Sequence, residues 1–292
     1  MAAPLKVLLT GATGQVGQAC RAVLPPDVDL RALTHAELDI GDSEASASSV
    51  AKYRPDVLIN CAAYTAVDKA ESEPDVAHRV NALGAANLAA ALASNPHGFM
   101  IQLSTDFVFD GNVSSPYLPD AEPRPLSVYG ASKLAGEKAV REQLGARAAI
   151  LRTSWVYSAS GSNFVKTMLR LMCKGDVRVI SDQAGTPTSA ASLATIIWRI
   201  AAERAAGTFH WTDAGIASWY DFAVAIAEEA APRGMVPEGV RVTPISTAEY
   251  PTPARRPAYS VLDKSSTQMR FGLTPGHWRE PLRLVIEELR SA

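Results

Sequence analysis

A tyrosine and a lysine four residues apart, Tyr129 and Lys133, form a pair that could perform acid–base chemistry. In a helix, side chains at this spacing share one face, so the lysine ammonium would stand beside the phenol. An isolated tyrosine has a pKa of about 10, and neighbouring positive charge favours its ionised form. Such a phenol can give its proton to a carbonyl oxygen as a general acid. Ser104 and Thr105, at the end of a predicted strand, supply hydroxyl groups that could hold that oxygen.

Three evenly spaced glycines, Gly11, Gly14 and Gly17, follow the first predicted strand. Gly11 permits a tight turn, Gly14 lets the backbone approach a pyrophosphate, and Gly17 lets the next helix pack on the strand. The N-terminus of that helix would offer free N–H groups and a positive dipole to phosphates. The pattern predicts a dinucleotide site, with a ligand-free turn as the competing interpretation. The other residues assigned to the site at this turn are Thr13, Gln15 and Val16.

The end of the second predicted strand bears on which dinucleotide binds. A carboxylate at this place would hold the ribose hydroxyls of NAD. Residues 33–35 read Leu-Thr-His, without a carboxylate, and Arg31 lies in the strand itself. We therefore expect NADPH as the cofactor, with NADH as an alternative. Asp39 and Ile40 are expected to flank the adenine, and a solvated loop is the competing interpretation of these two residues.

Strand and helix signals alternate through the first half of the chain. Short apolar runs predict strands, and longer alanine-rich or amphipathic runs predict helices. This alternation is typical of a parallel sheet with helices on both faces, whose buried strands are apolar throughout. We expect an α/β fold with a Rossmann-like, doubly wound parallel sheet. The strands are predicted at residues 6–10, 28–33, 56–61, 99–104 and 148–156, and the helices at 17–24, 77–93 and 129–144.

The pattern becomes less regular beyond residue 157. Residues 1–157 are assigned to a dinucleotide-binding domain, to whose sheet elements near residues 192–212 would return. Residues 158–191 and 213–292 would form a smaller C-terminal substrate-binding domain. Further helices are predicted at residues 163–173, 192–206 and 219–231, and further strands at 177–180 and 208–211.

Composition excludes several classes of protein. Of the 292 residues, 47% are hydrophobic and 20% are charged, which suits a large buried core. The net charge is −2, so nucleic acid is not expected as a partner. No apolar run is long enough to span a membrane, and no secretory signal is recognised, so no membrane partner is expected. Cys20, Cys61 and Cys173 form no disulfide or metal pattern, and we expect a cytoplasmic protein.

These motifs resemble the extended short-chain dehydrogenase/reductase family, and the resemblance covers almost the whole chain. Within that family they are similar to the branch that reduces a dTDP-linked 4-keto sugar to dTDP-L-rhamnose. Two of the matching blocks lie in the predicted substrate domain, so they bear on the substrate as well as on the fold. The matching blocks are residues 11–17, 61–71 (CAAYTAVDKAE), 103–111 (LSTDFVFDG), 129–137 (YGASKLAGE), 151–157 (LRTSWVY), 182–188 (DQAGTPT) and 256–263 (RPAYSVLD).

The resemblance implies roles for individual residues. Thr105, Tyr129 and Lys133 would be the catalytic trio, and Lys133 would also bind the nicotinamide ribose. The residues that would line the rest of the cofactor groove are Ala62, Ala63, Tyr64 and Ser104. A dTDP-sugar would be the substrate. The residues that would face it are Thr65, Val67, Asp68, Thr105, Asp106 and Trp155.

One local detail favours a reductase over a dehydratase. The similar dehydratases carry an Asp-Glu pair after the threonine, because elimination of water needs a second carboxyl group. Here Asp106 is followed by Phe107, where the family more often has tyrosine. Two alternatives remain open. One is a non-catalytic, NADP-binding regulatory subunit like the partner of methionine adenosyltransferase, and the other is a related reductase or epimerase acting on another nucleotide sugar.

Several residues have two interpretations each. Trp155 could stack on a sugar or fill the core, and Arg256 could bind a diphosphate or remain solvated. Asn81 could order the backbone behind the site or pack between helices. Glu71 and Glu73 are assigned to a solvated helix start, and no metal site is predicted. The oligomeric state is left open, with a homodimer as one alternative.

Overall fold

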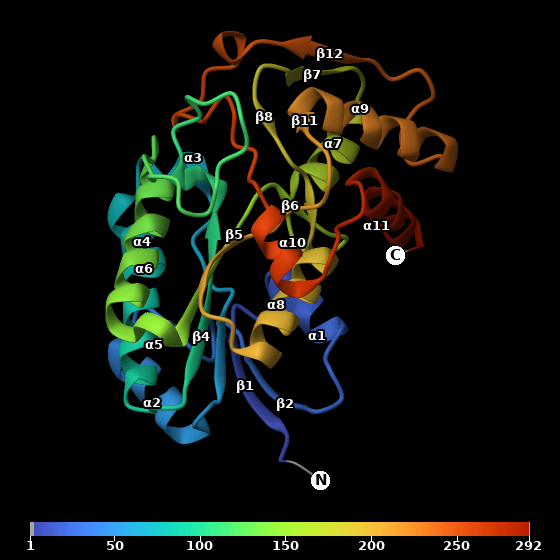
Figure 1. Ribbon diagram of the computed structural model, residues 1–292. Coiled ribbons are helices and arrows are strands. Elements are labelled where there is room, and N and C mark those ends of the chain that lie inside the picture. Colours follow the sequence, from blue (N-terminus) through green and yellow to red (C-terminus); the bar gives the residue numbers. More distant parts are fainter. Residues whose placement is uncertain (1–2, 292) are drawn as a thin grey trace.

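Six parallel strands form the central sheet of the computed structural model, which describes residues 3–291 (Figure 1). Their order across the sheet is β10-β5-β4-β3-β1-β2. The chain reverses its direction of travel across the sheet between β1 and β3, and open α/β sheets bind ligands beyond the carboxyl ends of strands at such a point. The strands are β1 (Leu5–Thr10), β2 (Val28–Leu33), β3 (Val57–Asn60), β4 (Phe99–Thr105), β5 (Ala148–Thr153) and β10 (Gly207–His210).

Helices cover both faces of this sheet, as Figure 1 shows. Successive strand residues point to opposite faces, so Leu8 packs toward α2, α5 and α6, whereas Leu9 packs toward α1 and α8. Burial on both sides explains why the strands are apolar throughout. The helices of this part are α1 (Gln15–Ala22), α2 (Ser43–Tyr53), α3 (Val67–Ala70), α4 (Pro74–His78), η1 (Arg79–Leu83), α5 (Gly84–Ala93), η2 (Asp106–Val108), α6 (Val128–Leu144), η3 (Gly145–Arg147) and α8 (Ala190–Glu203).

A second group of elements packs around its own core beside the carboxyl edge of the sheet (Figure 1). Tyr157, Phe222 and Trp278 lie in that core, each at most 3% exposed. Three two-stranded pairings join β7 with β12, β8 with β11, and β6 with β9. The elements are β6 (Val156–Tyr157), α7 (Phe164–Met172), β7 (Val177–Ile180), β8 (Ala184–Gly185), β9 (Thr188–Ser189), β11 (Ala217–Ser218), α9 (Trp219–Ala230), η4 (Ala231–Arg233), β12 (Val242–Ile245), η5 (Thr247–Glu249) and α11 (Arg279–Ser291). Helix α10 (Ser265–Phe271) instead contacts β10, and its Phe271 lies in the core of the main sheet.

The predicted α/β fold with a doubly wound parallel sheet is confirmed. Helix α8 packs on the face of the sheet that α1 also covers, and β10 pairs with β5, so the elements near residues 192–212 join the main sheet. The division of the chain into two domains at residue 157 stays our interpretation of this arrangement.

Some elements differ from the prediction. The strand expected at 148–156 is broken, because Trp155 adopts a left-handed φ of 47° between β5 and β6. The helix expected at 77–93 is interrupted by the π-helical turn η1. Helix α2 was not predicted, since its serines and alanines give little apolar contrast. It begins where Asp42 accepts the N–H groups of Glu44 and Ala45. Helix α11 was also missed.

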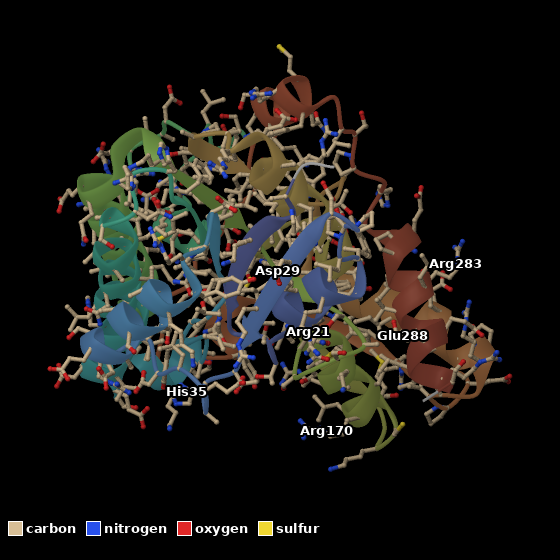
Figure 2. All side chains as sticks on the ribbon, turned by 90° about the horizontal axis from the view of Figure 1, so that it is seen from below. Arg21, Asp29, His35, Arg170, Arg283 and Glu288 are labelled. Carbon is tan, nitrogen blue, oxygen red and sulfur yellow. The ribbon has the colours of Figure 1, made fainter. Side chains whose placement is uncertain are left out.

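The surface carries charges of both signs. In Figure 2, seen from below, Arg21 and Asp29 lie near α1 and β2, whereas Arg283 and Glu288 lie on α11. This mixture agrees with the net charge of −2. Within residues 3–291, no helix combines the length and the apolar character that crossing a bilayer requires.

Candidate active site

Strand β4 and helix α6 bring the predicted catalytic trio together at the carboxyl edge of the sheet. Thr105 is the last residue of β4, and Tyr129 and Lys133 lie one turn apart on the side of α6 that faces β4. The Glu71 carboxylate accepts the first N–H of α6 at 2.8 Å and so fixes where this helix begins. The side chains of the trio are buried, with exposed fractions of 6%, 9% and 4% in chain order.

Burial dominates the protonation of the tyrosine–lysine pair. It raises the pKa of Tyr129 to about 12, although a hydrogen bond with Thr105 acts in the opposite direction. Burial lowers the pKa of Lys133 to about 8, and the Lys133 Nζ donates to the Leu103 carbonyl at 2.7 Å. The expectation that the neighbouring ammonium favours the phenolate is not met in the chain on its own, because desolvation outweighs the hydrogen bond with Thr105. Tyr129 is a neutral phenol near pH 7, which is the form a general acid requires.

The carboxyl group of Asp106 lies directly behind Thr105 and is 1% exposed. The Thr105 hydroxyl donates to Asp106 Oδ1 at 3.0 Å and accepts the Phe107 N–H at 3.2 Å. Burial raises the pKa of Asp106 to about 6. Asp106 Oδ2 and the Ser104 hydroxyl are buried without a hydrogen-bond partner in the described chain. Such atoms are costly to leave unpaired, so this strand end is suited to receiving polar groups of a ligand.

The glycine-rich turn and the residues that follow β2 and β3 line a groove of about 330 Å³. Gly11 has a φ of 71°, and a Cβ on Gly17 would lie 2.3 Å from the Gly11 carbonyl, so both positions require glycine. This groove at the N-terminus of α1 would offer backbone N–H groups and a helix dipole to the phosphates of a dinucleotide. The predicted cofactor residues that line it are Gly11, Thr13, Gly14, Asp39, Ile40, Ala62, Ala63 and Tyr64.

Two other predicted cofactor residues direct their side chains elsewhere. Val16 packs against the core between the sheet and α8. The Gln15 Oε1 accepts the Ser158 hydroxyl at 3.1 Å and the Asn163 amide at 2.9 Å. Only the backbone N–H groups of Gln15 and Val16, at the start of α1, remain available to a phosphate. Gln15 also joins the two groups of elements, a role that the sequence analysis missed.

Asn81 fixes the backbone at the edge of the groove. Its amide accepts the Tyr64 N–H at 2.9 Å, donates to the Tyr64 carbonyl at 3.0 Å and donates to the Ser132 hydroxyl at 3.0 Å. Asn81 lies in the π-helical turn η1, an irregularity that often occurs at functional sites. Gly136 of α6 lets η1 approach, because a Cβ there would lie 2.2 Å from the Asn81 carbonyl. Of the two interpretations of Asn81, the ordering of nearby backbone matches these contacts.

The two glutamates assigned to a solvated helix start have specific partners instead. Glu71 holds the N-terminus of α6, and Glu73 accepts the Tyr64 hydroxyl at 2.9 Å and pairs with Lys69 at 2.9 Å. For Glu71 the prediction was wrong, because closeness in sequence does not show which elements fold against this segment. Glu73 does stand at a helix start, as the N-cap residue of α4, and its side chain is 34% exposed. Between residues 3 and 291, no cluster of three or more His, Cys, Asp or Glu side chains could hold a metal ion.

A second cavity, of about 570 Å³, lies between α3, α7 and α9. Asp68 and Arg256 both line it and bind each other through two hydrogen bonds of 2.9 and 2.7 Å. The hydrogen bond from Arg256 is the main cause that lowers the pKa of Asp68. The Arg256 side chain is only 19% exposed, so it is not the solvated group of the competing interpretation. Thr65 is exposed, whereas Val67 packs beside Tyr129.

The indole of Trp155 already has an aromatic partner. It stacks on Trp219 with ring centroids 3.5 Å apart and planes 4° from parallel. Its positive φ is rare for a bulky residue, and such strain is often found at functional sites. One face of the Trp155 ring is therefore covered, and contact between Trp155 and a sugar stays a prediction that would use the rest of the ring.

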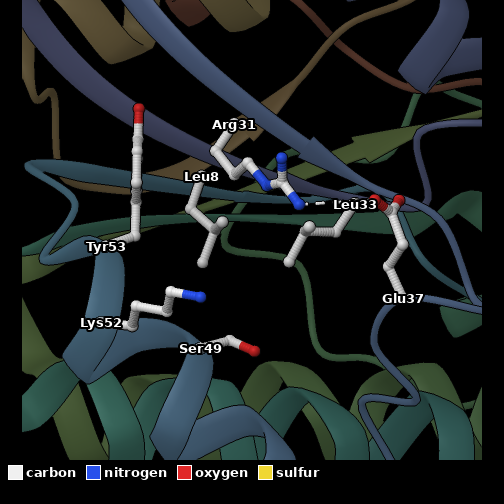
Figure 3. A pocket seen from close by; sticks show the side chains of 7 residues that line it. All are labelled: Leu8, Arg31, Leu33, Glu37, Ser49, Lys52 and Tyr53. Carbon is white, nitrogen blue, oxygen red and sulfur yellow. Dashed lines mark hydrogen bonds and ion pairs between the residues drawn. The ribbon is translucent and has the colours of Figure 1, made fainter.

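A cavity of about 470 Å³ beside β2 contains the side chains that bear on cofactor choice (Figure 3). Arg31 Nη2 lies 3.4 Å from Glu37 Oε1, and Glu37 Oε2 accepts the Thr34 N–H at 2.9 Å. The sequence indicated no carboxylate at this strand end, yet the turn that follows brings Glu37 back to it. Because a cation and a carboxylate both stand here, charge alone does not select NADPH over NADH.

A buried ion pair, to which the sequence analysis gave no role, lies one turn beyond Lys133. Arg152 on β5 donates to both oxygens of Glu137 on α6, at 2.9 and 2.7 Å. Neither side chain is more than 2% exposed. The signal that could have found it is the spacing of Tyr129, Lys133 and Glu137, which puts all three on one stripe of the helix.

Comparison with known proteins identifies the family of the chain. Residues 5–291 match the family described as RmlD substrate binding domain. The chain is 43% identical to the dTDP-4-dehydrorhamnose reductase of Burkholderia thailandensis, and the match covers 98% of this chain and 100% of that protein.

Two solved structures are similar along the whole chain. The dTDP-4-dehydrorhamnose reductase of Clostridium acetobutylicum has a TM-score of 0.91 and 41% identity, covering 98% of this chain and 99% of the other. The dTDP-4-dehydrorhamnose reductase of Bacillus anthracis, solved in complex with NADP, has a TM-score of 0.91 and 37% identity, with the same coverage of 98% and 99%. The chain therefore belongs to the RmlD family, the family of the dTDP-4-dehydrorhamnose reductases.

Proposed function

We propose that this chain reduces the 4-keto group of dTDP-4-dehydro-L-rhamnose to give dTDP-L-rhamnose, with NADPH as the reductant and NADH as an alternative. The observation that carries the proposal is the meeting of Thr105, Tyr129 and Lys133 beside the groove of the glycine-rich turn, since Tyr64, which lines that groove, packs in the same cluster as Tyr129. The reductase from Clostridium acetobutylicum and the NADP complex from Bacillus anthracis support the reaction and the cofactor.

Each side chain of the trio would have a different role in the reduction. The reduced nicotinamide, when bound, supplies the hydride. Tyr129, protonated near neutral pH, would donate its proton to the keto oxygen. The Thr105 hydroxyl, which donates to Asp106 Oδ1 in the chain on its own, would turn to donate its single proton to that oxygen and so hold it in place. The Lys133 ammonium donates one N–H to the Leu103 carbonyl, so its two other N–H groups remain available to ribose hydroxyls. Its ammonium also favours the phenolate that remains after proton transfer.

The sugar nucleotide would lie between the groove and the 570 Å³ cavity. Arg256, held by Asp68, would face the diphosphate, while Asp106 and Trp155 would face the sugar. Phe107 packs edge-on against Tyr129, with ring centroids 5.7 Å apart, and brings no second carboxyl group to the site. This placement favours simple reduction over dehydration. The remaining residues proposed to contact substrate are Thr65 and Val67.

Oxidation of NADPH and of NADH by the purified chain, followed with the keto-sugar nucleotide present, tests the proposal. We expect turnover, formation of the 4-hydroxy sugar, and a loss of about 10²- to 10⁴-fold in Tyr129→Phe while NADPH binding is kept. NADPH binding without turnover would instead favour the regulatory-subunit alternative. Turnover only with other dTDP- or UDP-sugars would favour a different reductase or an epimerase.

The remaining predictions need measurements of their own. The proposed cytoplasmic location is supported by cysteine usage, since all three cysteines are free thiols. The homodimer is to be checked by light scattering of the purified chain. The proposed domain division is to be checked by limited proteolysis near residue 157.

A further inference from the structure

We propose that Glu137 and Arg152 form a positioning pair for the catalytic trio, in which Glu137 fixes α6 along the sheet and maintains the ammonium form of Lys133. The inference rests on the proposed reduction for its effect on turnover. Its effect on Lys133 is a property of the chain itself, and can be measured without substrate.

The pair lies on the same stripe of α6 as the catalytic side chains. Tyr129, Lys133 and Glu137 follow at intervals of four residues, so the stripe is about 12 Å long. All three side chains are buried, and this side of α6 faces β4. A displacement of α6 along its axis would therefore move Glu137 and Tyr129 together.

Arg152 connects this stripe to the strand end that carries Thr105. In the β4–β5 ladder Arg152 is the partner of Ser104, and Thr153 is the partner of Thr105. The guanidinium is held on other sides as well, because it donates to the Pro119 carbonyl at 3.1 Å and lies 3.4 Å from the His210 ring. Two parallel hydrogen bonds to Glu137 fix direction as well as distance. The pair thus sets the position of Tyr129 relative to Thr105.

Glu137 also opposes the effect of burial on Lys133. Burial is the largest influence on the lysine and lowers its pKa to about 8, while the charge of Glu137 acts to raise it. Burial alone would raise the pKa of Glu137, but the Arg152 guanidinium outweighs it and lowers that pKa, so the carboxylate is ionised. Glu137 on α6 and Cys61 after β3 are the groups whose charge acts on Lys133. Glu137 is in turn bound by Arg152 on β5 and Arg141 on α6, while Asp106 after β4 acts on Tyr129.

A purely structural ion pair would behave differently. Buried pairs often add little net stability, and breaking one destabilises a fold without any specific effect on a neighbouring titration. The decisive observation is therefore the titration of Lys133 rather than the melting temperature.

The first test compares Glu137→Gln with the wild type. NMR of the chain with ¹³C-labelled lysine side chains should place the Lys133 titration at least one pH unit lower in the variant. In the pH profile of kcat/KM, the decrease on the basic side should move to lower pH by a similar amount. The value of kcat should fall at least tenfold. Arg141→Ala is the matched control, because it removes the outer contact to Glu137, at 3.1 Å, from a side chain that is 40% exposed. Its other hydrogen bond goes to the Thr208 hydroxyl of β10, which is not part of the trio.

A second variant keeps the test decisive if Glu137→Gln does not fold, since that change leaves Arg152 buried and unpaired. Glu137→Met combined with Arg152→Met removes both charges and should fold, with Lys133 still shifted down and kcat still reduced. A folded variant of either kind with a wild-type Lys133 titration and a wild-type kcat would overturn the proposal. If the wild type reduces no keto sugar, the NMR titration still decides the inference about Lys133.

Discussion

Burial, more than the spacing of charges, determines the chemistry of individual residues in this site. It raises the pKa of Tyr129 to about 12, lowers that of Lys133 to about 8 and raises that of Asp106 to about 6. Each shift favours the neutral form of the group, as desolvation requires. The tyrosine is thereby kept protonated until a carbonyl oxygen needs its proton.

Asp106 provides a prediction about stability and pH. Its pKa in the folded chain, about 6, lies above its ordinary value of 3.8, so between these values the folded state binds a proton that the unfolded state has lost. Stability contributed by this group therefore falls as pH rises through that window. The side chain of Asp106→Asn cannot ionise. The difference in free energy of unfolding between this variant and the wild type should therefore change in favour of the variant from about pH 4 to about pH 6, and should stay constant at higher pH.

Urea denaturation of both proteins across this pH range measures the effect. Asp75→Asn, at an exposed position, serves as the control and should differ from the wild type by a constant amount. A constant difference for Asp106→Asn as well would show that the carboxyl group does not titrate within the window.

The sequence alone was sufficient to identify the candidate residues that local spacing brings together. Tyr129 and Lys133, and the three glycines of the turn, were found because one turn of helix or one loop brings them together. Glu37 and Glu137 were missed as functional candidates, because their partners Thr34 and Arg152 are identified only by the fold. The direction of the Tyr129 pKa shift was missed for a related reason: the spacing of two residues carries no information about how much water surrounds them.

At the scale of elements, the position of α6 depends on close contact with the π-helical turn η1. Gly136 is the point of contact, and η1 carries the Asn81 side chain that holds both backbone groups of Tyr64. The alternation of strands and helices was predictable, because a sheet covered on both faces needs continuous apolar strands. The turn η1 was not, since a π-helical turn differs from an α-helix by a hydrogen-bond register that side-chain periodicity does not show.

Gly136→Ala should therefore disturb both stability and cofactor binding. The added Cβ would lie 2.2 Å from the Asn81 carbonyl, so η1 must move away and the hold on Tyr64 weakens. Overpacking of this kind costs about 1–3 kcal/mol, and we expect a lower melting temperature together with weaker NADPH binding. Calorimetry and fluorescence titration measure the two effects.

Gly276→Ala is the control for this substitution, because its added Cβ would meet only the flexible carboxylate end of Glu280, at 2.8 Å. It should leave both properties close to those of the wild type. If Gly136→Ala melts earlier yet binds NADPH normally, the Asn81 contact does not support the groove.

At the scale of the whole molecule, a few polar contacts join the sheet to the second group of elements. Gln15 binds Asn163 across one side of the molecule, and Asp68 binds Arg256 across another. Each contact joins a residue of the predicted cofactor domain to one of the predicted substrate domain. Both lie next to the proposed ligand sites, so a ligand bound between the two groups of elements would be in reach of either contact.

The Asp68–Arg256 contact gives the prediction that belongs to this scale. If Arg256 faces the diphosphate, Arg256→Met should raise KM for the sugar nucleotide about 10- to 100-fold, the usual effect of losing a charge-assisted hydrogen bond. Asp68→Asn should give a smaller increase, because it loosens the arginine without removing it. NADPH affinity should change less than twofold in both variants, since neither Asp68 nor Arg256 lines the cofactor groove. Arg178→Ala is the matched control: Arg178 lines the same cavity but is 62% exposed, so its loss should change KM little. Equal effects of Arg178→Ala and Arg256→Met on KM would mean that the cavity attracts the diphosphate by overall charge, and that the contact between the two groups of elements plays no specific part in binding.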